Sequence, residues 1–81
     1  MNVSVDFTGF QRTLTRVQSI KVPLLENMRV SDVLRHIKER FPQLALRESQ
    51  VFVVVNNDVS VKERVLKSDD RISIFPHIGG G

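Results

Sequence analysis

The 81-residue chain contains no cysteine, no tryptophan and no tyrosine, and it has only four glycines and three prolines. The lack of cysteine excludes disulfides, thiolate metal ligands and a cysteine nucleophile. No apolar run approaches the roughly 20 residues that a membrane-spanning helix needs, and the N-terminus lacks the apolar core of a signal peptide. We therefore expect a cytoplasmic protein that does not associate with a membrane.

The basic charge of the chain is mild and scattered, with a formal net charge of +3. Proteins that bind nucleic acids usually cluster their basic residues and add aromatic side chains for base stacking. Here the five phenylalanines do not alternate with lysines or arginines. We expect no nucleic-acid partner, and we interpret the charge as favouring an acidic protein surface.

Three of the four glycines stand together at the C-terminus, as Gly79, Gly80 and Gly81. Glycine has no Cβ, so such a run can enter a channel that is too narrow for other residues. The terminal carboxyl group is ionised at neutral pH and can act as an oxygen nucleophile. A frayed end without function is the alternative interpretation, and the glycines alone do not decide between the two.

The remaining residues predict one small domain with alternating strands and a single main helix. With 41% hydrophobic and 26% charged residues, the composition is that of an ordinary globular protein. A two-residue period predicts strands, and apolar residues at spacings of three and four predict a helix that begins after Ser31 as its N-cap. The expected elements are strands at 2–7 and 16–22 joined by a short polar turn around Gly9, a helix ending before Pro42, an interior strand at 51–55, an edge segment at 59–61 and a last strand at 71–75.

This order is most economically buried as an α+β fold, in which the helix lies across one face of a mixed sheet of four to five strands. We expect a single domain at 1–75 and a glycine-rich C-terminal tail at 76–81.

The order of elements, the chain length, the segment 68–76 (Ser-Asp-Asp-Arg-Ile-Ser-Ile-Phe-Pro) and the terminal glycines resemble the MoaD/ThiS family. These proteins are β-grasp sulfur carriers related to ubiquitin, and the resemblance covers the whole chain. The small subunit of molybdopterin synthase is the most similar type. Gly79 departs from the family pattern, because it adds a third glycine before the usual Gly80-Gly81 pair.

The resemblance implies a carrier rather than an enzyme. In this family the carboxylate corresponding to Gly81 is adenylated by an E1-like activating enzyme and then converted to a thiocarboxylate for cofactor biosynthesis. Gly81 is thus the reactive residue, while Gly79 and Gly80 give it access to the partner's channel. ATP and Mg²⁺ belong to the activating partner, and we expect no metal or cofactor on this chain. A larger subunit of a molybdopterin-synthase-type enzyme is the second expected partner.

The residues before the glycines are the candidates for partner binding: Phe75, Pro76, His77 and Ile78. If Ile72 and Ile74 face the core, strand alternation turns Phe75 outward beside the base of the tail. The alternative is that Pro76 bends the strand and places Phe75 in the core. Phe10 is a second aromatic candidate, and we expect it to cap the edge of the core.

Three other functions remain open at this point. A ubiquitin-like modifier would be joined through Gly81 to lysines of other proteins, using the same activation. A sulfur carrier could instead serve thiamin synthesis or tRNA thiolation. A β-grasp interaction module would need no reactive tail at all.

Overall fold

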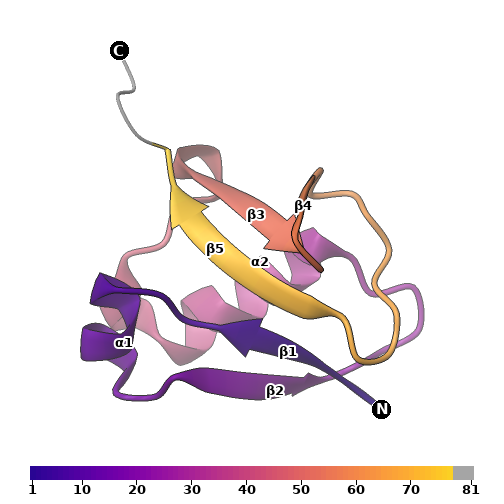
Figure 1. Ribbon diagram of the computed structural model, residues 1–81, viewed down its shortest axis with the longest axis horizontal. Helices are drawn as coiled ribbons and strands as arrows, with labels where there is room; N and C mark the ends of the chain where they lie inside the picture. The colour runs from indigo at the N-terminus through magenta and orange to yellow at the C-terminus, as the bar shows by residue number, and fades with distance from the viewer. Residues whose placement is uncertain (78–81) are drawn as a thin grey trace.

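The computed structural model describes residues 1–77, which form a five-stranded sheet in the order β2-β1-β5-β3-β4 (Figure 1). The central strand β5 runs parallel to β1, whereas the other neighbouring strands are antiparallel. This arrangement confirms the mixed sheet that the sequence predicts. The strands are β1 (Asn2–Asp6), β2 (Ser19–Pro23), β3 (Val51–Val55), β4 (Asp58–Ser60) and β5 (Arg71–Pro76).

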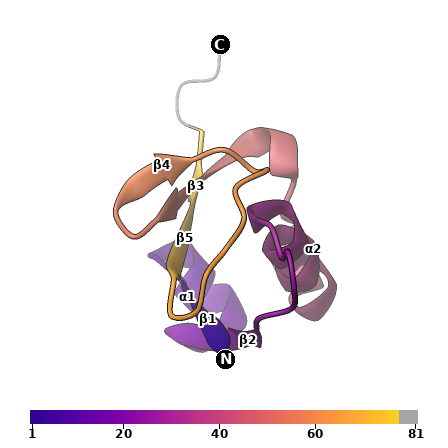
Figure 2. The same cartoon turned by 90° about the vertical axis from the view of Figure 1, so that its right-hand side faces the viewer.

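Helix α2 (Val30–Arg40) covers one face of the sheet (Figure 2). No helix of residues 1–77 covers the opposite face. The stripe of apolar residues at helical spacing, which includes Leu34 and Ile37, is fully buried against the sheet. The helix starts earlier than expected, because Arg29 rather than Ser31 is the N-cap. The backbone N–H of Arg29 donates to Asp32 Oδ2 at 2.9 Å, which satisfies a donor at the helix start.

The hydrophobic core lies between α2 and the inner face of the sheet. Apolar residues of β1, β2, β3 and β5 meet those of α2, with contributions from the connecting segments. The rings of Phe7 and Phe41 pack edge to face with their centroids 5.4 Å apart. The strand residues of this core are Val3, Val5, Ile20, Val22, Val53, Val55, Ile72 and Ile74.

The connection between β1 and β2 differs from the predicted short turn, because it contains helix α1 (Phe10–Thr15). Gly9 precedes the helix with φ 45° and ψ −118°, a conformation that glycine adopts readily. Arg16 ends the helix in the left-handed region at φ 64°. Phe10 does not cap the core as expected, since 75% of its surface is exposed.

Two short 3₁₀ turns link α2 to β3: η1 (Pro42–Leu44) and η2 (Glu48–Gln50). The predicted stop at Pro42 is confirmed, since α2 ends at Arg40 and Pro42 opens η1. Within residues 1–77 no helix has the length and apolarity needed to cross a membrane.

Candidate functional site

The root of the C-terminal tail is held by the sheet up to His77. On the last part of β5, Phe75 pairs with Phe52 and Pro76 with Val51 of β3. The backbone N–H of His77 then donates to the carbonyl of Gln50 at 3.0 Å. The sheet therefore holds the chain as far as His77, the last described residue. The predicted site residues Ile78, Gly79, Gly80 and Gly81 lie outside the described residues.

An apolar cluster beside this root occupies the sheet face that α2 leaves uncovered. Its members are Phe52 and Val54 of β3, Val59 of β4 and Phe75 of β5, here called the outer-face cluster. The rings of Phe52 and Phe75 stack with centroids 5.3 Å apart and planes at 20°. Val59 is 72% exposed, so the cluster is open to a partner.

The structure confirms the predicted outward orientation of Phe75. Ile72 and Ile74 point into the core, and Phe75 is half-buried against Phe52 on the other face. The alternative placement of Phe75 in the core is wrong. His77 also faces Phe52, at a centroid distance of 5.7 Å. Phe75 and His77 therefore contact the same ring beside the tail, and their role in partner binding stays a prediction.

A polar pair borders the outer-face cluster toward the far end of β5. The Arg71 guanidinium binds the Asp6 carboxylate through two nitrogens, with Nη2–Oδ1 at 2.9 Å and Nε–Oδ2 at 3.2 Å. Both side chains are partly exposed. The outer face is thus apolar near the tail root and polar farther along β5.

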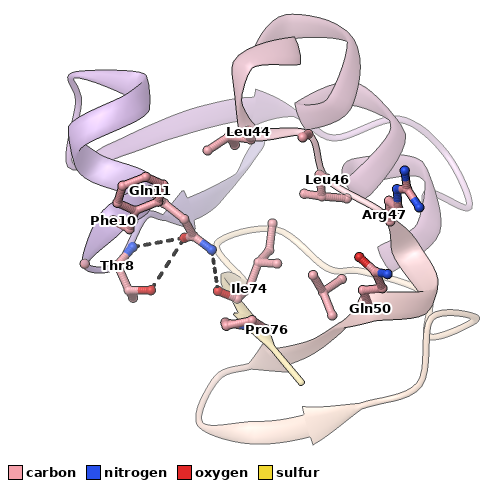
Figure 3. Close-up of a pocket in the computed structure, with 12 residues that line it drawn as sticks. Thr8, Phe10, Gln11, Leu44, Leu46, Arg47, Gln50, Ile74 and Pro76 are labelled. Carbon is pink, nitrogen blue, oxygen red and sulfur yellow. Dashed lines mark hydrogen bonds between the residues drawn. The ribbon is translucent and has the colours of Figure 1, made fainter. Parts of the chain in front are cut away.

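A groove lies on the other side of the tail root, between α1 and the η1–η2 connector (Figure 3). It has a volume of about 360 Å³. Pro76 belongs both to this groove, here called the α1 groove, and to the root of the tail. The lining residues are Thr8, Gly9, Phe10, Gln11, Leu44, Ala45, Leu46, Arg47, Gln50, Val51, Ile74 and Pro76.

The sequence did not predict the α1 groove, because it did not predict the helix that forms one wall. The only signal for that wall was Phe10, an aromatic residue directly after Gly9 that we expected at the edge of the core. Gln11 anchors α1 to the last strand, since its Nε2 donates to the carbonyl of Ile74 at 2.8 Å. These residues are 63 positions apart, so no local pattern could join them.

Neither histidine is part of a metal centre within the described part of the chain, where no group of three or more His, Asp or Glu could hold an ion. His77 is exposed at the tail root. His36 is half-buried on α2. Its Nε2 is shielded from water and has no hydrogen-bond partner among residues 1–77.

The geometry defines a class of protein: a mixed sheet with its C-terminal strand at the centre and one main helix packed across a face is the ubiquitin-like β-grasp architecture. A comparison with protein families then shows that the model of the ThiS family matches residues 5–81. The chain belongs to the ThiS family.

Several solved structures have the same fold. The putative molybdopterin converting factor subunit 1 of Pyrococcus furiosus is 26% identical, with a TM-score of 0.83 over 96% of this chain and 99% of that one. Small archaeal modifier protein 1 of Methanosarcina acetivorans is 20% identical, with a TM-score of 0.73 over 99% and 96%. A complex of subunits 1 and 2 of molybdopterin-converting factor from Helicobacter pylori gives 22% identity and a TM-score of 0.66 over 100% of both chains. A search of curated proteins found no match.

These comparisons confirm the resemblance and the β-grasp fold that the sequence predicts. The chain has the fold of the ubiquitin-like sulfur carriers related to ThiS and to the small subunit of the molybdopterin converting factor. Small proteins of this type carry sulfur and are not themselves enzymes.

Proposed function

We propose that this chain is a sulfur carrier whose Gly81 carboxylate is adenylated and then converted to a thiocarboxylate. The observation that carries the proposal is the extent of the family match, which continues through the C-terminal glycines to residue 81. The structure supports it by fixing the chain at His77, directly before the last four residues of the sequence.

The proposed reaction has two steps on partner enzymes. A carboxylate oxygen of Gly81 attacks the α-phosphorus of ATP, which releases pyrophosphate and forms an acyl-adenylate. A sulfur donor at the oxidation level of sulfide then attacks the acyl carbon, AMP leaves, and the thiocarboxylate remains. Activation is needed because an ionised carboxylate is a poor electrophile, whereas AMP is a good leaving group. ATP and Mg²⁺ act on the activating enzyme, and Gly79 and Gly80 allow the tail to reach it.

The outer-face cluster is the proposed docking surface for these partners. It exposes aromatic and aliphatic side chains directly beside the tail, and aromatic residues are favoured anchors in protein interfaces. Phe75, Pro76, His77 and Ile78 continue from this cluster into the tail. The proposed partners are an E1-like adenylating enzyme and a larger subunit of the molybdopterin-synthase type. The complex from Helicobacter pylori shows that a protein of this fold assembles with a second subunit.

Molybdopterin synthesis is the preferred destination of the sulfur. The support is the 26% identity to the Pyrococcus furiosus protein, which is named a putative molybdopterin converting factor subunit. Conjugation to lysines through Gly81 is the second candidate, because the archaeal modifier has the same fold. Thiamin synthesis and tRNA thiolation would use the same activated tail.

The intact mass of the protein tests the carrier function. The chain is incubated with the activating enzyme of its host, ATP, Mg²⁺ and a sulfur donor. We expect a mass increase that corresponds to one oxygen replaced by sulfur, and we expect deletion of Gly81 to abolish it. The control is the same enzyme preparation acting on a carrier that it is known to activate.

If the control is activated and this chain forms neither an adenylate nor a thiocarboxylate, the carrier proposal is wrong. The chain would then be a β-grasp interaction module. Covalent conjugates of high mass in cells, lost on deletion of Gly81, would instead favour the modifier function.

A further inference from the structure

The α1 groove is an open apolar site with a buried floor. Ile74 and Leu46 form part of this floor and are almost fully buried, at 1% and 8% exposure. Leu44 and Val51 are half-buried at its sides. Phe10 stands at one end with 75% of its surface exposed. The exposed ring of Phe10 therefore extends the apolar lining of the groove.

Hydrogen bonds hold both walls of the groove in place without an occupant. Gln11 accepts from the backbone N–H of Thr8 at 3.1 Å and donates to the carbonyl of Ile74 at 2.8 Å, so α1 is tied to β5. Gln43 Nε2 donates to the carbonyl of Leu14 at 3.2 Å, so α1 is also tied to η1. A preformed site binds its ligand without the cost of ordering its walls.

The charge of the groove favours a carboxylate in the ligand. Arg47 is the single charged residue among those that line it, and it lies at the end opposite Phe10 (Figure 3). Arg47 makes no ion pair with any of residues 1–77. The groove therefore suits an aliphatic side chain next to an acidic one, because the first fills the apolar floor and the second reaches the guanidinium.

The position of the groove determines which protein would supply such a segment. Pro76 forms part of its wall, and Gln50, another lining residue, binds the N–H of His77. A partner that encloses the tail must surround this root. It therefore covers the outer-face cluster on one side and meets the α1 groove on the other.

We propose that the α1 groove receives a segment of the tail-accepting partner protein, in which a bulky aliphatic residue adjoins an aspartate or glutamate. The inference rests on the proposed function for the identity of that partner. A second copy of this chain is a poorer occupant, because its net charge of +3 opposes that of the first copy.

A peptide selection on the full-length protein tests this proposal. Random octapeptides displayed on phage are selected against the chain, and the enriched peptides are synthesised and titrated into ¹⁵N-labelled protein. We expect an aliphatic residue next to an acidic one in these peptides, and we expect shifts of the amide signals of Phe10, Leu44 and Arg47. The substitution Arg47→Glu should weaken binding by about tenfold or more, as loss of a charge-assisted contact does.

Lys21→Glu is the matched control, because it makes the same charge change on the exposed edge strand β2 and should leave peptide binding unchanged. The proposal is wrong if no peptide is enriched, if the peptides lack an acidic residue, or if they shift the outer-face cluster instead of the groove. If the groove's amide signals shift with protein concentration in the absence of peptide, the occupant of the groove is a second copy of this chain. If these signals shift when residues 78–81 are deleted, the occupant of the groove is the chain's own C-terminal tail.

The selection contains no ATP, so its result is independent of the carrier chemistry. Peptide binding without thiocarboxylate formation would keep the groove as a docking site and reject the carrier function. Thiocarboxylate formation without peptide binding would keep the carrier function and reject the groove as a docking site. Where both succeed, Arg47→Glu should raise the KM of the activating enzyme or the Kd of the larger subunit, with kcat unchanged.

Discussion

Asp70 shows how one buried carboxylate organises the turn that leads into the central strand. It is 7% exposed and accepts two hydrogen bonds, from the backbone N–H of Lys67 and from Asn56 Nδ2, each at 2.8 Å. Asn56 Oδ1 in turn accepts from the N–H of Arg71 at 2.9 Å. The pair Asp69-Asp70 therefore has a structural role in this turn, which sets the start of strand β5.

Asp70→Asn should lower the free energy of unfolding by about 1–3 kcal/mol. The asparagine amide turns a donor toward either the Lys67 N–H or Asn56 Nδ2, and that partly buried donor loses its partner. Asp69→Asn is the control, because it removes the same charge from an exposed neighbour at φ 69°, a conformation that asparagine tolerates. Urea unfolding of both variants measures the difference. Equal stabilities would show that the Asp70 hydrogen bonds contribute nothing.

Phe75→Ala should weaken binding to the activating enzyme or to the larger subunit by about tenfold or more, as loss of an interface anchor does. The variant should lose about 2 kcal/mol of stability, since it gives up the ring stack with Phe52 and the partial burial of its own ring. Leu25→Ala serves as control, because Leu25 is also exposed, at 66%, but lies outside the outer-face cluster. Calorimetric titration gives both affinities. Equal effects of the two substitutions would contradict the docking role of the cluster.

At the scale of elements, α1 depends on the backbone at Gly9. A Cβ added to Gly9 would meet no heavy atom within 4 Å, so the cost of Gly9→Ala comes from its positive φ alone. We expect a loss of about 1–3 kcal/mol in the free energy of unfolding. Thr13→Ala, at an exposed position of the same helix, should be neutral or slightly stabilising. Denaturant unfolding compares the two, and an unchanged Gly9→Ala variant would show that this turn is not strained.

Periodicity predicted the elements that are long and regular. The spacing of Val33, Leu34 and Ile37 fixed the buried face of α2, and strand alternation fixed the outward side of Phe75. Helix α1 has only six residues, too few for a helical period to stand out among polar neighbours. The N-cap of α2 was misplaced because Ser31 is a good local candidate, whereas Arg29 is held in the extended region.

The candidate site has one part that could be predicted from the sequence and one part that could not. Its tail side is local: the glycines, Pro76 and Phe75 are adjacent in sequence, and their chemistry can be inferred from that order. The groove side is not local, because it brings together α1, the η1–η2 connector and β5. Hydrogen bonds join these segments across long sequence separations: 29 positions between Gln43 and Leu14, and 63 between Gln11 and Ile74. Side-chain contacts of this range leave no pattern in the sequence.

For the whole molecule, the division between body and tail has a measurable boundary. Strand β5 runs through Pro76, and the N–H of His77 is bound to Gln50, so the sheet holds the chain beyond residue 75. The buried apolar side chains of the described core all lie between Val3 and Ile74. Within residues 1–77 the body therefore depends on β5 as far as His77, and the described core ends at Ile74.

Two truncations test this boundary. Ending the chain after His77 should change the free energy of unfolding by no more than about 0.5 kcal/mol, as for surface changes remote from the core. Ending it after Ile74 should cost about 2 kcal/mol or more, because it removes the pairs of Phe75 with Phe52 and of Pro76 with Val51. Urea unfolding reports the stability, and the intact-mass assay reports the carrier function, which both truncations should abolish. A clear loss of stability in the longer truncation would mean that residues 78–81 contribute to the body, and the tail could not then be treated as a separate reactive segment.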